Sequence, residues 1–177
     1  MIRNPISEEY FDWVDRFDRA IGITSRLDAH RQNLFHRAVH LYAVGENGGV
    51  ILQRRSLEKD LEPGLWTVSC SGHVDRGESY LQAGVRELEE ELGVSVEPEN
   101  LRELLRSDPS FENGYEFVRS YEVMGVVYPK PNPLEVSEVR EIQLKELHLW
   151  LRKEPDRFSS SMRCLFPLAS KRFTQIT

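Results

Sequence analysis

The stretch of sequence that decides the fold covers residues 72–94 and reads GHVDRGESYLQAGVRELEEELGV. Its second half predicts a helix over residues 79–92, ending at Gly93, a residue that favours a left-handed helix cap. On a wheel turned by about 100° per residue, the apolar positions form one stripe that is expected to face the core. That stripe consists of Leu81, Val85, Leu88 and Leu92.

A second face of the same predicted helix carries three glutamates, Glu87, Glu90 and Glu91. Like charges at spacings of three and four residues destabilise a helix. The positions four residues beyond the last two are Val94 and Ser95, so neither supplies a cation. A divalent ion would relieve the repulsion, and Mg²⁺ prefers oxygen ligands whereas Zn²⁺ suits them poorly. A solvated acidic face is the alternative interpretation.

Outside this helix, strand-like segments are interspersed with helix-like ones, which predicts an α/β fold with a mixed sheet covered on both faces. The expected strands are residues 10–14, 20–25, 34–44, 50–55, 66–74, 101–106, 115–127 and 138–144. Two further helices are expected over residues 145–153 and 159–173. We therefore expect a single domain over residues 1–177, with N-terminal strands in 8–30, a core in 34–145 and C-terminal helices in 145–173.

The composition is that of a folded protein of ordinary size. The chain has 177 residues, of which 40% are hydrophobic and 29% are charged, enough apolar material for a core. A net charge of −6 gives no bulk attraction to nucleic acid or to anionic membranes, so neither is an expected partner. Two cysteines, and no long apolar run at the start or elsewhere, predict a cytoplasmic protein without a disulfide framework.

Residues 72–94 resemble the signature of the Nudix hydrolases at every specified position. That signature is a glycine, five residues, a glutamate, seven residues, and then Arg-Glu-apolar-x-Glu-Glu-x-Gly-apolar. A chance match in one chain is below about one in a million at usual residue frequencies. The resemblance implies an α/β/α sandwich and Mg²⁺-dependent hydrolysis of a diphosphate linkage in a small organic or nucleoside diphosphate. Mn²⁺ is an alternative ion.

The resemblance also implies roles for individual side chains. The residues expected at the metal site are Gly72, Glu78, Glu87, Glu90 and Glu91. Among them, Glu87 is either a ligand or the general base, while Arg86 orients the cluster by pairing with a carboxylate. Gly72 lets the backbone approach the metal because it has no Cβ. The ion readies water for attack on phosphorus, and a carboxylate within reach takes the proton.

Further segments resemble the isopentenyl-diphosphate isomerase-like branch of this superfamily, namely residues 34–39, 52–56, 63–67 and 136–140. In those isomerases an arginine and a lysine four residues later hold the substrate diphosphate, and Arg55 and Lys59 match that pair. Solvated surface charges are the alternative. Trp66 borders the intervening loop and is a candidate to stack on a base or isoprenoid, although core packing is the commoner role of tryptophan.

The isomerases also use a histidine-rich metal site. His36 and His73 fall at matching positions, and His30 matches with a shift of one residue, so the three would form a second metal site. Glu116 matches an acidic residue that completes the isomerase site and serves as a ligand or base in some hydrolases. Ordinary hydrogen-bonded histidines and a solvent-facing glutamate are the alternative interpretation.

Two departures disfavour isomerase activity. The isomerases need a cysteine two residues before the position of His73, but Ser71 stands there and Cys70 would face the opposite way in a strand. The acid cluster is also complete, as hydrolysis requires. An isomerase-like enzyme and a non-catalytic diphosphate-binding module remain the alternatives. The apolar positions of the last helix predict either core packing or a homodimer surface, and they are Met162, Leu165, Phe166 and Leu168.

Overall fold

The computed structural model describes residues 9–174, and its centre is a seven-stranded mixed sheet. Its strands are β3 (His36–Val44), β4 (Val50–Arg55), β5 (Trp66–Thr67), β6 (Cys70–His73), β7 (Leu101–Ser107), β8 (Glu116–Val126) and β9 (Val136–Ile142). The order is β5-β4-β3-β8-β7, with β6 paired to β3 and β9 paired to β4. β3 and β8 run parallel, whereas the other pairings described for this sheet are antiparallel.

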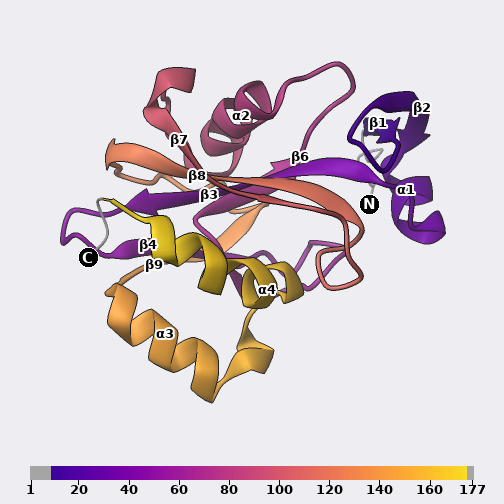
Figure 1. Cartoon of the computed structure of the whole chain (residues 1–177). Helices are drawn as coiled ribbons and strands as arrows, with labels where there is room; N and C mark the ends of the chain where they lie inside the picture. Colours follow the sequence, from indigo (N-terminus) through magenta and orange to yellow (C-terminus); the bar gives the residue numbers. More distant parts are fainter. Residues whose placement is uncertain (1–8, 175–177) are drawn as a thin grey trace, which may run out of the picture.

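Helices cover both faces of this sheet, as Figure 1 shows. Helix α2 (Tyr80–Leu92) lies on one face, and α3 (Leu144–Lys153) and α4 (Ser160–Ala169) lie on the other. Short 3₁₀ turns follow α2, α3 and α4, and they are η1 (Pro98–Asn100), η2 (Pro155–Arg157) and η3 (Ser170–Arg172). The predicted α/β/α sandwich with a mixed sheet is therefore confirmed. No helix within residues 9–174 has the length and apolar character needed to cross a membrane.

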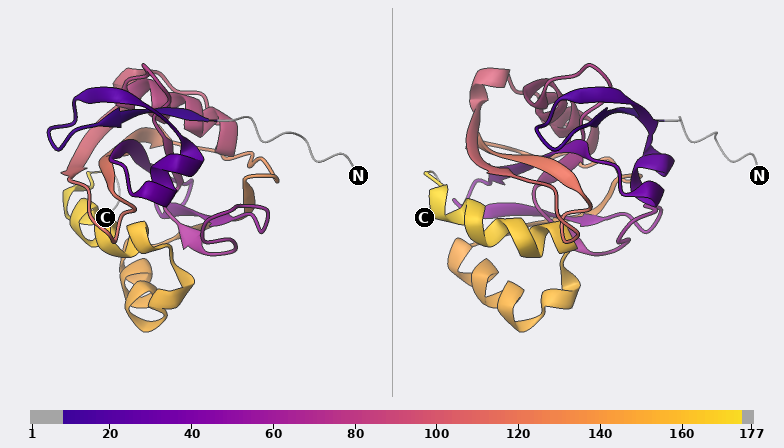
Figure 2. Two further views of the ribbon diagram at one scale, coloured as in Figure 1. Left: turned by 90° about the vertical axis from the view of Figure 1, so that its right-hand side faces the viewer. Right: turned by 45° about the vertical axis from the view of Figure 1, so that its right-hand side comes forward.

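The N-terminal part forms a separate two-stranded sheet of β1 (Tyr10–Val14) and β2 (Ala20–Ser25), followed by helix α1 (Arg26–Gln32). Figure 2 shows these elements at one end of the main sheet. The strands match the prediction, although its first residue, 8, lies outside the described part. The sequence did not predict α1, because this seven-residue helix buries only Ala29 and so lacks an apolar stripe. Its N-cap is Ser25, whose side chain accepts a hydrogen bond from the Asp28 N–H.

Three other predicted boundaries shift in the structure. The extended run 66–74 is two short strands, β5 and β6, which pair with different neighbours. The last strand begins at Val136 and ends at Ile142, because Leu144 already opens helix α3. The final helix stops at Ala169 and continues as the 3₁₀ turn η3.

Helix α2 is the element that most directly positions the site. Ser79 and Gln82 form a reciprocal capping box at its start, and Gly93 caps its end with a φ of 60°. The predicted core stripe was wrong at Leu81, which is 38% exposed, because the buried face is rotated toward Glu91. Gly84 permits this rotation, since an added Cβ would lie 2.9 Å from Leu101 Cδ1.

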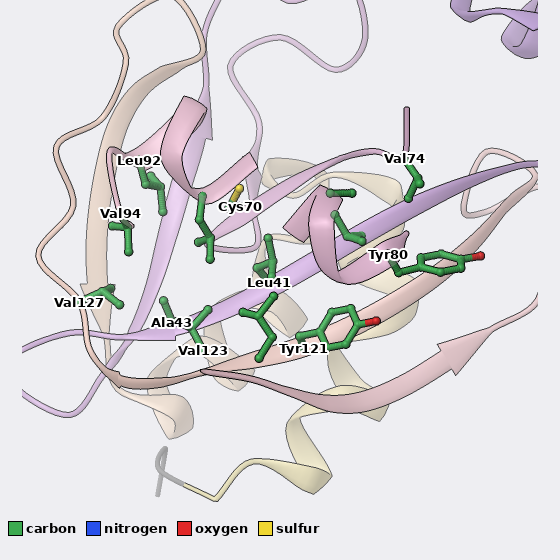
Figure 3. Close-up of a cluster of buried hydrophobic side chains, with 14 of the residues drawn as sticks. Leu41, Ala43, Cys70, Val74, Tyr80, Leu92, Val94, Tyr121, Val123 and Val127 are labelled. Atoms are coloured by element: carbon green, nitrogen blue, oxygen red, sulfur yellow. The ribbon is translucent and has the colours of Figure 1, made fainter. Parts of the chain in front are cut away.

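The core on the α2 side, part of which Figure 3 shows, joins this helix to β3, β6 and β8 through side chains such as Leu41, Cys70 and Tyr121. A second core fills the space between the sheet and the C-terminal helices. Met162, Leu165 and Phe166 are at most 1% exposed, so these positions of α4 belong to the core and are not a dimer surface.

Candidate active site

A cavity of about 730 Å³ lies beside β6, between α2 and the loops that follow β4 and β7. Its wall contains most of the residues that the sequence singled out, which come from five separate segments of the chain. They are His30, Arg55, Lys59, Gly72, His73, Arg86, Glu87, Glu90, Glu91 and Glu116. The fold therefore brings the predicted acidic, basic and histidine groups to a single cavity.

Glu91 is the deepest of the helix glutamates, with 3% of its surface exposed. Its carboxylate accepts hydrogen bonds from Gln53 Nε2 at 2.6 Å and from the Ser71 backbone N–H at 3.3 Å. Burial raises the pKa of Glu91 above its ordinary value. Gln53 was not identified as a site residue from the sequence, although a glutamine that follows the apolar residues of β4 could have indicated a buried polar contact.

Glu87 lies beside Gly72 at the same wall. A Cβ added to Gly72 would collide with the Glu87 carboxyl group, so only glycine permits this approach of backbone and acid. Burial and then the neighbouring charge of Glu91 raise the pKa of Glu87 to about 8. The pair is therefore an anionic centre that the protein leaves under-compensated.

Arg86 is the cation that contacts these acids. Its guanidinium donates to Glu87 Oε1 at 2.8 Å and to Glu90 Oε2 at 3.1 Å. It also holds both carboxylate oxygens of Glu78 and the His73 carbonyl. Positions 94 and 95 supply no cation, but Arg86, which precedes the glutamates on the helix, pairs with Glu87 and Glu90. The predicted pairing of Arg86 with a carboxylate is present.

The glutamates of α2 line the wall without converging on one point. Glu90 keeps 56% of its side chain exposed, while Glu91 points to Gln53. Among residues 9–174, the cluster whose ligand atoms all lie within 4.8 Å of one another is a different one. It consists of His30, His36, His73 and Glu116, the group expected at a second metal site.

Sheet register assembles this histidine cluster. His36 of β3 lies opposite Glu116 of β8, and His73 of β6 lies opposite Ala38, two residues further along β3 on the same face. Helix α1 adds His30, whose ring centroid is 4.9 Å from that of His36 and 5.2 Å from that of His73. His73 Nε2 lies 3.1 Å from Glu116 Oε1, and His36 Nε2 lies 3.5 Å from the same oxygen.

The ring nitrogens are arranged as metal ligands require. His36 Nδ1 lies 2.8 Å from the Leu34 carbonyl, which fixes the proton on that nitrogen and leaves a lone pair on Nε2. The Nε2 atoms of His30 and His36 are buried without a hydrogen-bond partner. Burial, followed by repulsion from His73 and His36, lowers the pKa of His30 to about 4, so its imidazole is neutral. Burial would raise the pKa of Glu116, but the facing rings of His36 and His73 outweigh burial and lower it.

Two of the three predicted substrate-binding residues line the cavity. Lys59 forms an ion pair with Glu135, and Arg55 Nε donates to the Leu61 carbonyl at 3.0 Å. Trp66 is 2% exposed and packs edge-on against Trp150, so the structure assigns it to the core between β5 and α3. The expectation that Trp66 contacts substrate is thereby corrected.

The raised pKa of Glu87 predicts a pH-dependent stability in metal-free protein. Between its ordinary value of 4.5 and about 8, the folded protein binds more protons than the unfolded chain, so the free energy of unfolding falls as pH rises. Histidines with lowered pKa act in the opposite direction below about pH 6.5. The readout is therefore the difference in melting temperature between wild type and Glu87→Gln, measured in chelator across this range. We expect the variant to gain relative stability with rising pH, whereas Glu89→Gln should track wild type.

Comparison with known proteins places the chain in a family. It matches the NUDIX domain model over residues 34–164. It is 36% identical over 152 residues to isopentenyl-diphosphate Delta-isomerase of Ruegeria pomeroyi, covering 83% of this chain and 82% of that protein. It is 34% identical over 164 residues to Nudix hydrolase 3 of Arabidopsis thaliana, covering 84% of this chain and 21% of that protein. The crystal structure of DR0079 from Deinococcus radiodurans superposes with a TM-score of 0.73 at 28% identity, over 94% of this chain and 100% of that one. The chain thus belongs to the Nudix family.

Proposed function

We propose that this protein hydrolyses a diphosphate linkage in a small organic or nucleoside diphosphate and that it requires Mg²⁺, for which Mn²⁺ can substitute. The observation that carries the proposal is the buried, under-compensated pair Glu87 and Glu91 at the wall of a cavity that also contains basic side chains. Membership of the Nudix family supports cleavage of diphosphate bonds in general. The requirement for Mg²⁺ and the class of substrate are inferred from the acidic and basic side chains of the cavity.

The residues present fit a magnesium ion. Carboxylates of Glu87, Glu90 and Glu91, with the backbone at Gly72, supply the oxygen donors that Mg²⁺ prefers, and the raised pKa of Glu87 reflects charge that a cation would neutralise. When bound, the ion would lower the pKa of water and neutralise phosphate oxygens. Arg86 donates side-chain hydrogen bonds to Glu78, Glu87 and Glu90, and so does not neutralise Glu91 directly.

The side chains of the cavity can perform the remaining tasks. Glu87 is positioned to accept a proton from water, since its carboxyl group lies at the cavity wall beside Gly72 and is held there by Arg86. Arg55, at the end of β4, and Lys59, on the loop that follows, line the cavity and would bind phosphate oxygens, Lys59 by exchanging its ion pair with Glu135. Gln53 fixes the Glu91 carboxylate by a hydrogen bond and so holds one acid in place.

The histidine cluster fits a second, softer metal ion. Three imidazoles and one carboxylate suit Mn²⁺, Fe²⁺ or Zn²⁺ better than Mg²⁺, and the orphaned Nε2 atoms of His30 and His36 have no other function in the described structure. Glu116 would complete the ligand set, since its carboxylate faces both His36 and His73. We propose this site as a companion to the magnesium site in the same cavity.

Isopentenyl-diphosphate isomerisation is the second candidate function, favoured by the histidine cluster and by the names of several relatives. The chain lacks its acid group, because Ser71 occupies the matching position. Cys70 is fully buried on the α2 side of β6, and burial, with the nearby Glu91, raises the pKa of its thiol well above the ordinary value. Neither residue is suited to exchange a proton with an alkene.

A metal-dependent substrate panel tests the proposal. Phosphate or monophosphate release would be measured with Mg²⁺ and with Mn²⁺ from nucleoside diphosphates, sugar-nucleotide diphosphates and prenyl diphosphates, with isopentenyl diphosphate assayed separately for its allylic isomer. We expect hydrolysis of at least one panel member that chelator abolishes. Allylic product without any hydrolysis would replace the proposal by isomerisation, and tight binding without either reaction would indicate a binding module.

A further inference from the structure

The loop between β7 and β8, residues 108–115, presents an unusual aromatic side chain to the cavity. Phe111 lines the cavity and is 79% exposed, the highest value among the large apolar side chains of residues 9–174. Its ring meets Tyr115 edge-on at a centroid distance of 6.4 Å. This single contact leaves most of the phenyl surface open to solvent, where an apolar surface gains free energy from any partner that covers it.

The loop that carries Phe111 is held in one conformation. Asn113 is 2% exposed, and its side chain accepts from the Ser110 N–H at 2.8 Å and donates to the Asp108 and Glu116 carbonyls at 3.0 Å each. Tyr115 adopts a φ of 63°, a left-handed conformation that a non-glycine residue holds only when its surroundings enforce it. The backbone under Phe111 is therefore ordered before a ligand arrives, which reduces the entropic cost of binding.

A second apolar side chain belongs to the same cavity. Leu61 is 43% exposed, and it stands on the loop of Arg55, whose Nε donates to the Leu61 carbonyl. Among the charged residues that line the cavity, Glu91 is buried, with only 3% of its surface exposed. The cavity is thus lined by acids and bases together with two exposed apolar side chains, Phe111 and Leu61.

We propose that Phe111 and Leu61 form the subsite for the organic group of the substrate, and that this group has an aromatic or apolar surface. This inference rests on the proposed function, which places the diphosphate beside the charged side chains of the cavity, including Arg55 and Lys59. A nucleobase and a prenyl chain share the required chemistry, because each can cover the phenyl ring. A diphosphate that carries only a methyl group or a bare sugar lacks the surface that this subsite binds.

The test measures binding, so that it does not depend on catalysis. Three methylene-bridged, non-hydrolysable diphosphonates would be titrated calorimetrically with Mg²⁺ into the full-length protein, carrying an adenosine, a geranyl or a methyl group. We expect Phe111→Ala to weaken the adenosine or the geranyl probe about tenfold, or about 1.4 kcal/mol, and to leave the methyl probe unchanged. Phe17→Ala is the matched control, because Phe17 is 60% exposed on the β1–β2 turn outside the cavity.

A further variant identifies the source of the organic group. Phe111→Leu should restore binding of the geranyl probe when the group is aliphatic, but should not restore the adenosine probe, whose base needs a ring for stacking. Equal binding of both bulky probes to wild type and Phe111→Ala would overturn the proposal, as would an equal loss for all three probes. Weaker binding in Phe111→Ala without any hydrolysis in the substrate panel would leave this subsite in place and reject only the proposed function.

Discussion

Replacing Glu91 with glutamine is expected to lower the turnover number for diphosphate hydrolysis about a hundredfold or more, which corresponds to about 2.7 kcal/mol of transition-state stabilisation. The amide keeps the size of the side chain, and its carbonyl can still accept from Gln53 Nε2, so the change removes the charge and one acceptor oxygen. Steady-state kinetics at saturating Mg²⁺, with the best substrate of the panel, measures the effect.

The Glu91→Gln variant should be at least as stable as the wild type, although its turnover is lower. Glu91 is 3% exposed and its pKa is raised by burial, so removing the buried charge is expected to maintain or increase the melting temperature in metal-free buffer. Glu89→Gln is the matched control on the same helix, because Glu89 is exposed and its carboxylate accepts a hydrogen bond from the nearby Ser95 hydroxyl. Unchanged turnover in both Glu91→Gln and Glu90→Gln would end the hydrolase proposal.

Replacing His36 with asparagine is expected to weaken binding of a transition-metal ion about a hundredfold or more. His36 is fully buried, its Nδ1 is fixed by the Leu34 carbonyl, and its Nε2 faces the cluster, so its loss removes a preorganised ligand. The measurement is a titration with Co²⁺, whose visible absorption reports coordination. We expect one equivalent bound by wild type with a spectrum indicating nitrogen ligands.

Two further variants make this result specific. His148→Asn is the matched control, because His148 lies on α3 and contacts Ser170 outside the cluster. Glu116→Gln should also weaken the Co²⁺ signal, since it removes the carboxylate that faces both His36 and His73. Glu91→Gln should leave the signal intact, because Glu91 is not a member of the histidine cluster. A titration curve that is the same for His36→Asn and wild type would exclude the histidine site.

Several features of the fold could be predicted from the sequence because they depend on neighbours along the chain. The strands of the N-terminal hairpin and the ends of α2 follow from turn residues, capping residues and apolar periodicity. Helix α1 could not be predicted, since its stability comes from contacts with β1 and β2 rather than from an apolar stripe. This omission affects the account of the candidate site, because α1 carries His30, a member of the histidine cluster.

The candidate residues were identified more completely than their environments. Spacing on one helix shows that Glu87, Glu90 and Glu91 are neighbours, but it cannot show which of them is buried. That depends on the rotation of α2 over the sheet, which Gly84 allows by its close approach to Leu101. Trp66 illustrates the same limit, since its position beside a loop did not reveal that α3 covers it.

The sequence by itself determined the family, the glutamate-bearing helix with its caps, and the identity of the candidate acidic, basic and histidine groups, because helix formation and motif spacing are local properties. Only the tertiary structure decided that Gln53 and Ser71 hold Glu91, that Arg86 occupies the other acids, and that the histidines converge on Glu116. Those contacts join residues far apart in the chain. They depend on strand register and helix rotation, which long-range packing sets and local periodicity does not encode.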